Sequence, residues 1–258
     1  MIVDWQLAES VSGIARGAGK LLLSMMGTPL VRHDKPNAGF VTPADVASEE
    51  LIVRQLRALP VDAGIWAEEG GKEPQSSEWM WVIDPLDGTT NFANGIAYFC
   101  VSIALAYRDE TQLSVIYNPI TDELFAAIKG YGVRCNGRAI AVGATPMDKS
   151  IVATCMPDSC EQEYADCARN MRAVRNEVAS VRLMGAAALD LANMAAGRFD
   201  GFFAHGLAWW DVAAGILMVQ EAGGTVTDFE GNPVDSTFKT FVAATPVIHE
   251  SLRLLLRD

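Results

Sequence analysis

The stretch that decides the fold is residues 81–92, which read Trp-Val-Ile-Asp-Pro-Leu-Asp-Gly-Thr-Thr-Asn-Phe. With Trp79 and Met80 it begins as an apolar run rich in β-branched and aromatic residues, which predicts a buried strand. Pro85 cannot donate a hydrogen bond to a neighbouring strand, so we expect the strand to break there. Two carboxylates, Asp84 and Asp87, lie on either side of that break.

The residues after the break are suited to binding an anion. Gly88 allows the backbone to bend freely and to approach a ligand closely. Thr89, Thr90 and Asn91 supply side-chain oxygens and a run of backbone N–H groups. A hard divalent cation takes oxygen ligands, whereas turn amides take a phosphate. An Asp-Gly pair alone commonly marks only a turn, so the prediction of a metal and phosphate site depends on the complete string.

The complete string resembles, nearly letter for letter, a signature of the inositol monophosphatase family of magnesium-dependent, lithium-sensitive phosphatases. Two further stretches resemble the family's other signatures, in the same order. Residues 65–71 are similar to the one usually written Gly-Glu-Glu, although Ala67 replaces its Gly. Residues 209–224 are similar to the third, whose aspartate is Asp211 here. The resemblance covers essentially the whole chain.

Length and composition agree with one large domain or two small ones, because 258 residues with 50% hydrophobic content can bury a substantial core. The resemblance implies the first alternative. We expect a single domain over residues 1–258, a layered α–β–α–β–α sandwich of mixed α/β class and commonly a homodimer. Residues 1–145 would form an N-terminal half with the acids and a large antiparallel sheet, and residues 146–258 a C-terminal α/β half.

The charge of the chain excludes some partners. The 32 acidic and 20 basic residues give a net charge of −12, which argues against nucleic acid because phosphate neutralisation needs clustered Lys and Arg. Such a chain looks equally unsuited to a small phosphorylated metabolite. Bound Mg²⁺ resolves this conflict, since the ion supplies the local positive charge.

The cysteines and the hydropathy pattern point to a cytoplasmic protein. The five cysteines are an odd number and show no zinc-like spacing, which predicts free, mostly buried thiols in a reducing compartment; they are Cys100, Cys135, Cys155, Cys160 and Cys167. No apolar run reaches the roughly 18 residues of a membrane span, so we expect no membrane association. The N-terminus also lacks a signal-peptide pattern.

The first 60 residues predict two helices. Residues 4–26 have apolar side chains at helical spacing, and their Gly17–Lys20 segment resembles a phosphate loop too poorly to be one, so we expect it to serve helix packing. Residues 32–39 are polar and predict a loop or hairpin. Thr42 is expected to cap a second helix with Pro43 in its first position, and that helix should stop at Pro60. Asp45 would then be either a first-turn capping residue or a catalytic one.

The middle of the chain predicts an antiparallel meander, and the last part predicts alternating strands and helices. In the meander, strands are expected at 100–107, 112–117, 124–128 and 132–135. In the last part, strands are expected at 151–155, 199–203 and 241–243, and helices at 161–176, 186–196 and 212–221, followed by one more helix. A helix that starts at 212 would make Asp211 a capping residue, as an alternative to a metal ligand.

The resemblance assigns a role to each site residue. The first metal would be held or surrounded by Glu68, Asp84, the Leu86 carbonyl and Thr89. The second would be held by Asp84, Asp87 and Asp211. Asp45 with Thr89 would orient and deprotonate the attacking water. The phosphate and the rest of the substrate would meet Gly88, Thr89, Thr90, Ala187 and His205. Lys35 would reach the shell of a third, weaker metal, so that two or three Mg²⁺ are expected per site.

The reaction implied is hydrolysis of a phosphate monoester. Zinc and serine hydrolases are disfavoured, because the chain has only three histidines, which we interpret as surface or loop residues, and lacks His-Glu-x-x-His and Gly-x-Ser-x-Gly. A family member that has lost catalysis and serves as a regulatory binding partner is a further alternative. Retention of every metal-site acid argues against it.

The substrate is less well determined than the reaction. Inositol phosphatases keep an acid seven residues before the Asp of the third signature, and Ala204 stands there in this chain, with His205 and Asp200 as nearby substitutes. Gly185-Ala186-Ala187 is likewise a less polar version of the family's pocket motif. The Asp-Gly-Thr-Thr ending argues against 3′-phosphoadenosine. Inositol phosphate, fructose 1,6-bisphosphate, histidinol phosphate and other sugar or polyol phosphates remain open.

Overall fold

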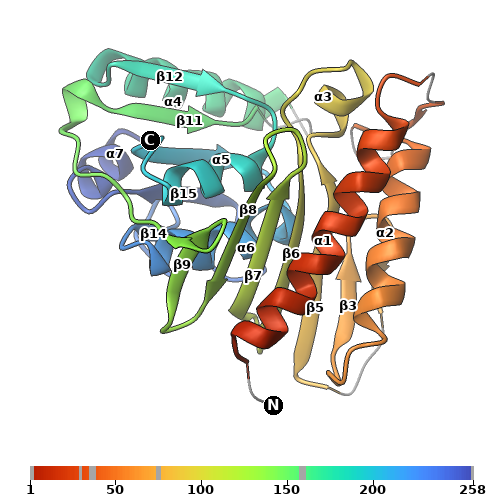
Figure 1. Ribbon diagram of the computed structural model, residues 1–258. Helices are drawn as coiled ribbons and strands as arrows, with labels where there is room; N and C mark the ends of the chain where they lie inside the picture. The colour runs from red at the N-terminus through yellow and green to blue at the C-terminus, as the bar shows by residue number, and fades with distance from the viewer. Residues whose placement is uncertain (1–2, 29–30, 35–38, 74–76, 157–160, 257–258) are drawn as a thin grey trace.

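Five layers of secondary structure build the protein, in the order α–β–α–β–α (Figure 1). The structure is a computed structural model that describes residues 3–28, 31–34, 39–73, 77–156 and 161–256. An outer pair of helices packs on a large sheet, a middle pair lies between that sheet and a smaller one, and a third pair covers the smaller sheet. The helices are α1 (Trp5–Met25) and α2 (Pro43–Leu56), α5 (Ala187–Ala195) and α6 (Trp209–Glu221), and α4 (Glu161–Glu177) and α7 (His249–Leu255). The predicted layered sandwich is confirmed.

The large sheet has eight strands in the order β10-β9-β8-β7-β6-β5-β3-β4. All its neighbours are antiparallel except β3 and β5, which run parallel. The strands are β3 (Gly64–Ala67), β4 (Gly71–Lys72), β5 (Trp79–Asp87), β6 (Cys100–Tyr107), β7 (Glu110–Asn118), β8 (Glu123–Ile128), β9 (Gly132–Cys135) and β10 (Arg138–Ala139). The predicted meander is therefore confirmed, and Asp109 and Asn136 take the left-handed conformation in its turns.

The small sheet has five strands in the order β12-β11-β13-β15-β14. They are β11 (Ile151–Thr154), β12 (Ser180–Leu183), β13 (Gly201–His205), β14 (Thr225–Thr227) and β15 (Thr240–Ala244). Strands β12 and β14 were not predicted, because they are short edge strands without a buried residue. Strand β13 begins two residues later than predicted.

Strand β5 separates two hydrophobic cores. Its Trp81 and Ile83 pack with α1 and α2, whereas Val82 packs with the middle helices, as the alternation of side chains along a strand requires. The Gly17–Lys20 segment serves packing as predicted, because a Cβ on Gly19 would lie 2.5 Å from the Tyr117 ring. No helix of the described residues is long and apolar enough to cross a membrane.

The segment between α1 and α2 forms the expected hairpin, in which β1 (His33–Asp34) pairs with β2 (Phe40–Val41). Thr42 caps α2 and Pro43 occupies its first turn, which confirms the prediction. The helix ends at Leu56 and not at Pro60. Proline disfavours helical geometry in the residue before it, so the last helical turn is lost ahead of Pro60.

Three further predictions are wrong. Strand β5 does not break at Pro85 but continues to Asp87, with a shift in register between Asp84 and Asp87 that leaves Pro85 without a pairing partner. Helix α6 begins at Trp209, so Asp211 lies in its first turn and not at the N-cap position, although its Oδ2 accepts from the Ala208 amide at 2.7 Å and so still caps the helix. Histidines 205 and 249 are buried in β13 and α7, and only His33 is exposed. The short hydrophobic segments around both buried histidines explain this difference.

The cysteines agree with the prediction as far as the structure describes them. Cys100 and Cys167 are buried, and Cys135 and Cys155 are half-buried. All four are free thiols. Cys160 lies outside the described residues.

Candidate functional site

The irregular end of β5 places two acids close together in the interior. Asp84 is 2% exposed and Asp87 is 7% exposed. The register shift between them interrupts the pairing with β6, as in a β-bulge, a feature that commonly re-aims side chains next to active sites. The Asp84 Oδ1 atom accepts a hydrogen bond from the Leu86 amide at 3.0 Å, which fixes the turn of the backbone between the two carboxylates.

Asp84 lies within electrostatic reach of three other carboxylates. Burial raises the pKa of Asp84 well above its usual value, and repulsion from Glu68, Asp87 and Asp211 raises it further. Asp84 and Asp87 are buried, and Glu68 and Asp211 are half-buried. Mutually repelling oxygen donors of this kind suit a hard divalent cation such as Mg²⁺, although among the described residues no three His, Cys, Asp or Glu side chains converge around a common point.

Helix α2 fixes the turn that carries Glu68. The Glu68 amide donates to the Ile83 carbonyl at 3.1 Å, which continues the pairing of β3 with β5. The next amide, of Glu69, donates to Glu49 Oε2 on α2 at 2.9 Å. Ser48, on the same helix, donates to the Pro85 carbonyl at 2.8 Å. One helix thus positions both the Glu68 turn and the end of β5.

Asp87 holds the start of helix α5, 100 residues further along the chain. Its Oδ1 accepts from the Ala187 amide at 3.0 Å, and its Oδ2 accepts from the Leu189 amide at 3.2 Å and from the Cys100 thiol at 3.4 Å. The N-cap residue Ala186 makes no side-chain cap, so Asp87 satisfies the first-turn amides instead. Burial raises the pKa of Asp87 to about 6, although these hydrogen bonds oppose the shift.

Asp45 connects a helix cap to Thr89. Its Oδ2 accepts from the Thr42 amide at 2.8 Å and from the Thr42 hydroxyl at 2.5 Å, which completes a capping box. Its Oδ1 accepts from the Thr89 hydroxyl at 2.8 Å, and the Leu86 carbonyl offers Thr89 a second acceptor at 3.1 Å. Asp45 is fully buried. The capping contact and the contact with Thr89 are therefore both present.

Gly88 is required by the geometry of the turn that follows. Its φ of +94° is left-handed, and a Cβ there would lie 3.1 Å from the Tyr98 carbonyl and 3.2 Å from the Ala186 methyl. Gly88 precedes the short helix α3 (Thr89–Ala93). On this helix, the buried Asn91 amide donates to the carbonyls of Tyr98 and Met184, both at 2.8 Å. The turn is thus fastened to the loop before α5.

The residues predicted to contact the substrate around position 204 are buried or have structural contacts, so the structure supports a substrate role for them less well than it supports the roles of the acids. Ala204 is fully buried and pairs with Phe241 on β15. Asp200 Oδ2 accepts from the Ile151 amide at 2.9 Å, which indicates a structural role. The His205 ring lies 3.0 Å from the Asn170 amide nitrogen of α4 and packs edge-on against Phe229. The contact with Asn170 turns His205 toward helix α4, which covers the small sheet.

Three predicted residues remain, and each has a different environment or lies outside the described residues. Ala187 is buried, and its amide is held by Asp87. Thr90 is exposed beside the turn. Lys35 lies outside the described residues.

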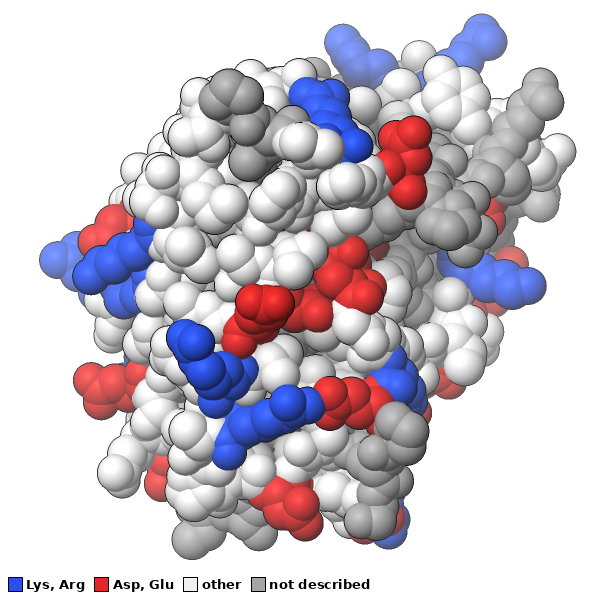
Figure 2. All heavy atoms as spheres, turned by 90° about the vertical axis from the view of Figure 1, so that its right-hand side faces the viewer, with Lys and Arg blue, Asp and Glu red and all other residues white. Residues whose placement is uncertain are grey.

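Four residues that contact the site were not predicted as site residues from the sequence: Ser48, Glu49, Asn91 and Cys100. A signal existed for Ser48 and Glu49, because they follow Asp45 by three and four residues and so share a face of α2 with it. The face of the molecule drawn in Figure 2 shows acidic side chains near its centre, with a small group of adjoining basic side chains below them.

This combination of five layers and a buried acidic site between the large sheet and the middle helices has close counterparts. The sequence profile of the inositol monophosphatase family matches residues 6–257. Nus factor SuhB from Escherichia coli (strain K12) is 40% identical over 248 residues, 95% of this chain and 93% of that protein. Inositol-1-monophosphatase from Rhizobium meliloti (strain 1021) is 39% identical over 225 residues, 86% of this chain and 85% of that protein.

The fold also matches solved structures. The extragenic suppressor protein suhB from Bartonella henselae superposes with a TM-score of 0.93 at 38% identity, covering 98% of this chain and 99% of that one. The chain belongs to the inositol monophosphatase family.

Proposed function

We propose that this protein is a Mg²⁺-dependent phosphate monoesterase that acts on inositol phosphate or a related small sugar or polyol phosphate. The observation that carries the proposal is the Thr89–Asp45 hydrogen bond of 2.8 Å beside the buried carboxylate cluster. It joins a hydroxyl, which can hold a water, to a buried carboxylate, which can accept a proton.

The metal would be held by oxygen ligands alone. Glu68, Asp84, the Leu86 carbonyl, Asp87 and Asp211 would bind two or three Mg²⁺, with Thr89 beside them. Bound Mg²⁺ supplies charge neutralisation and lowers the pKa of a coordinated water. We also propose that Li⁺ inhibits the enzyme by occupying one of these Mg²⁺ positions, as the resemblance to the family implies.

The chain's own groups would perform the remaining work. Thr89 orients the attacking water and passes its proton toward Asp45, whose other oxygen stays fixed by Thr42. The backbone amides of Gly88 and Thr89 hold the phosphate oxygens, because the left-handed Gly88 bends the chain without a side chain in the way. Asp87 fixes the first turn of α5 by accepting from its amides, and α5 would line the substrate side of the site.

The substrate would be selected weakly. Ala186, Ala187 and Ala204 are buried and apolar, and an apolar wall discriminates less than one that hydrogen-bonds a substrate hydroxyl. Fructose 1,6-bisphosphate and histidinol phosphate are therefore alternative substrates.

The proposal extends to assembly and location. The resemblance to the family implies a homodimer, which sedimentation would test. The free thiols support a cytoplasmic location.

A second candidate function comes from the relatives named Nus factor SuhB. This chain could act as a Nus factor without hydrolysing phosphate, which is the regulatory alternative named above, against which the retained metal-site acids argue. Its net charge of −12 favours protein contacts over nucleic acid contacts in such a role.

The test is phosphate release from a panel of monoesters with Mg²⁺, with a chelator, and with Li⁺ added to Mg²⁺. We expect release that needs Mg²⁺ and falls with Li⁺. Ca²⁺ alone should support little release, since its larger, irregular coordination aligns the phosphate poorly. No release from any ester in Mg²⁺ would refute the phosphatase assignment and favour the regulatory one.

A further inference from the structure

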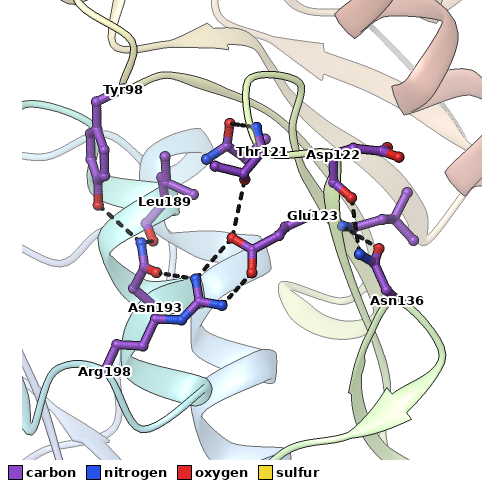
Figure 3. A network of polar contacts seen from close by, with 10 residues as sticks. Tyr98, Thr121, Asp122, Glu123, Asn136, Leu189, Asn193 and Arg198 are labelled. Carbon is purple, nitrogen blue, oxygen red and sulfur yellow. Dashed lines mark hydrogen bonds and ion pairs between the residues drawn. The ribbon is translucent and has the colours of Figure 1, made fainter.

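The hydroxyl of Tyr98 is held between two residues of helix α5. It donates to Asp190 Oδ1 at 2.5 Å and accepts from Asn193 Nδ2 at 3.1 Å. Figure 3 shows the Tyr98 hydroxyl directed at Asn193 of α5. A phenol hydroxyl has one hydrogen to donate and can also accept, so Tyr98 satisfies the Asp190 acceptor and the Asn193 donor at the same time.

The two ends of this contact lead to two different parts of the site. On its own segment, the Tyr98 carbonyl accepts from Asn91 at 2.8 Å and lies against Gly88, where a Cβ would come within 3.1 Å. On the other side, the first turn of α5 donates its amides to Asp87. Tyr98 therefore links the Gly88 turn to the helix that holds Asp87.

The same Asn193 side chain also takes part in a second anchor, at the far end of α5. Arg198 Nη1 donates to Asn193 Oδ1 at 2.8 Å and to Glu123 Oε2 of β8 at 2.9 Å (Figure 3). This anchor involves the exposed side chain of Arg198 and the half-buried one of Glu123. The contact between Tyr98 and Asp190 lies deeper, between the anchor and the Asp87 end of the helix.

Asp190 makes the contact with Tyr98 costly to lose. It is fully buried, and its Oδ2 has no hydrogen-bond partner among the described residues. Without the Tyr98 hydroxyl, Oδ1 would lose its partner too. A buried polar group without partners drives local rearrangement, and here the rearrangement would start in the helix that holds Asp87.

We propose that Tyr98 is a positioning residue: its hydroxyl fixes α5 against the Gly88 turn, and so sets the place of the Asp87 carboxylate. The role rests on the proposed function, since it matters for catalysis only if Asp87 binds metal. Removing a group that orients a metal ligand commonly changes metal affinity or activity by about tenfold or more, and Tyr98 would orient Asp87 through helix α5.

The experiment compares Tyr98→Phe with Tyr117→Phe. The control deletes the same hydroxyl at Tyr117, which donates to Asp122 at 2.9 Å in the turn between β7 and β8 and packs in the core on the α1 side of the large sheet, away from the core that contains α5. For Tyr98→Phe we expect apparent Mg²⁺ affinity, measured by calorimetry, to weaken about tenfold and kcat to fall by a similar factor. We also expect faster amide hydrogen exchange in residues 187–195, with β7 unchanged. Tyr117→Phe should alter none of these quantities.

A second pair of variants tests the partner. Asp190→Asn keeps an acceptor for the Tyr98 hydroxyl and should retain most of the Mg²⁺ affinity, whereas Asp190→Leu should behave like Tyr98→Phe. The proposal is overturned if Tyr98→Phe matches Tyr117→Phe in metal affinity and in exchange of α5. The exchange comparison decides the role of Tyr98 even if the wild-type protein hydrolyses no ester, an outcome that would refute the proposed function alone.

Discussion

The two walls of the site differ in how they are built. The wall from α2, β3 and β5 is polar, and buried side chains fasten it: Asp45 binds Thr89, Ser48 binds the Pro85 carbonyl and Glu49 binds the Glu69 amide. The wall from α5, β13 and α6 carries the buried, apolar Ala187 and Ala204, with Asp211 as its proposed metal ligand and backbone amides directed at Asp87.

This difference separates two tasks. A polar wall with fixed carboxylates can hold a metal and move a proton, and these tasks require the same groups for any phosphate ester. An apolar wall excludes water but distinguishes substrates weakly. We therefore expect substitutions in the first wall to change the rate and substitutions in the second to change the choice of substrate.

The largest effect should come from Asp84. Asp84→Asn should abolish turnover, because Asp84 would contact both metals. The metal-free fold should be retained or slightly stabilised, since removing one of four clustered charges relieves repulsion. Phosphate release and thermal unfolding measure the two outcomes. Turnover near the wild-type rate in purified Asp84→Asn would contradict the metal assignment.

The next effect should come from Asp45. Asparagine caps helices about as well as aspartate, so Asp45→Asn should leave the melting temperature nearly unchanged. If Asp45 receives the proton through Thr89, kcat should still fall by about 10²–10⁴-fold. Equal activity of this variant and the wild type would reduce Asp45 to a helix cap.

A third effect links pH to metal binding. The Asp87 pKa in the fold is about 6 against an ordinary value of 3.8, and that of Asp84 is raised too. The metal-free fold therefore keeps protons that the unfolded chain releases, so the stability contribution of these groups is complete below about pH 4 and is lost as pH rises through 6. Added Mg²⁺ binds the ionised carboxylates and should offset this loss.

Thermal unfolding with a chelator and with Mg²⁺, at about pH 5 and about pH 7.5, measures this effect. The gain in melting temperature from Mg²⁺ should be larger at the higher pH. Asp84→Asn serves as the control and should show a smaller gain at both. An equal gain for the wild type at both pH values would show that the ion binds elsewhere.

The smallest effect concerns the second wall. The ratio of kcat/KM for inositol phosphate to that for glycerol phosphate should be modest in the wild type. Ala204→Glu should increase this ratio by a factor that corresponds to about 1–2 kcal/mol of transition-state binding, if the carboxylate meets a substrate hydroxyl. Because Ala204 is fully buried, the melting temperature must be measured alongside, with Ala204→Gln as a matched control for size. A wild type already highly selective for inositol phosphate would contradict the weakly selective wall.

Much of the first wall could be predicted from local sequence. The capping box at Thr42 and Asp45 is encoded within four residues, and the strand at 79–83 by its composition. The resemblance identified the acids, and the structure brings Glu68, Asp84, Asp87 and Asp211 within electrostatic reach of one another. The continuation of β5 past Pro85 was not predicted, because a bulge needs no hydrogen bond from the proline.

What the sequence determined by itself is thus the family, the layered α/β class and the order of the acids, since each is written in short strings or in periodic patterns. Only the tertiary structure decided that Asp87 holds the start of α5, that Glu49 fixes the Glu68 turn and that Tyr98 reaches Asp190. These contacts join residues 20 to 100 positions apart, and no local pattern encodes them. They exist because packing of the layers leaves buried amides and carboxylates that must find partners where the fold brings them together.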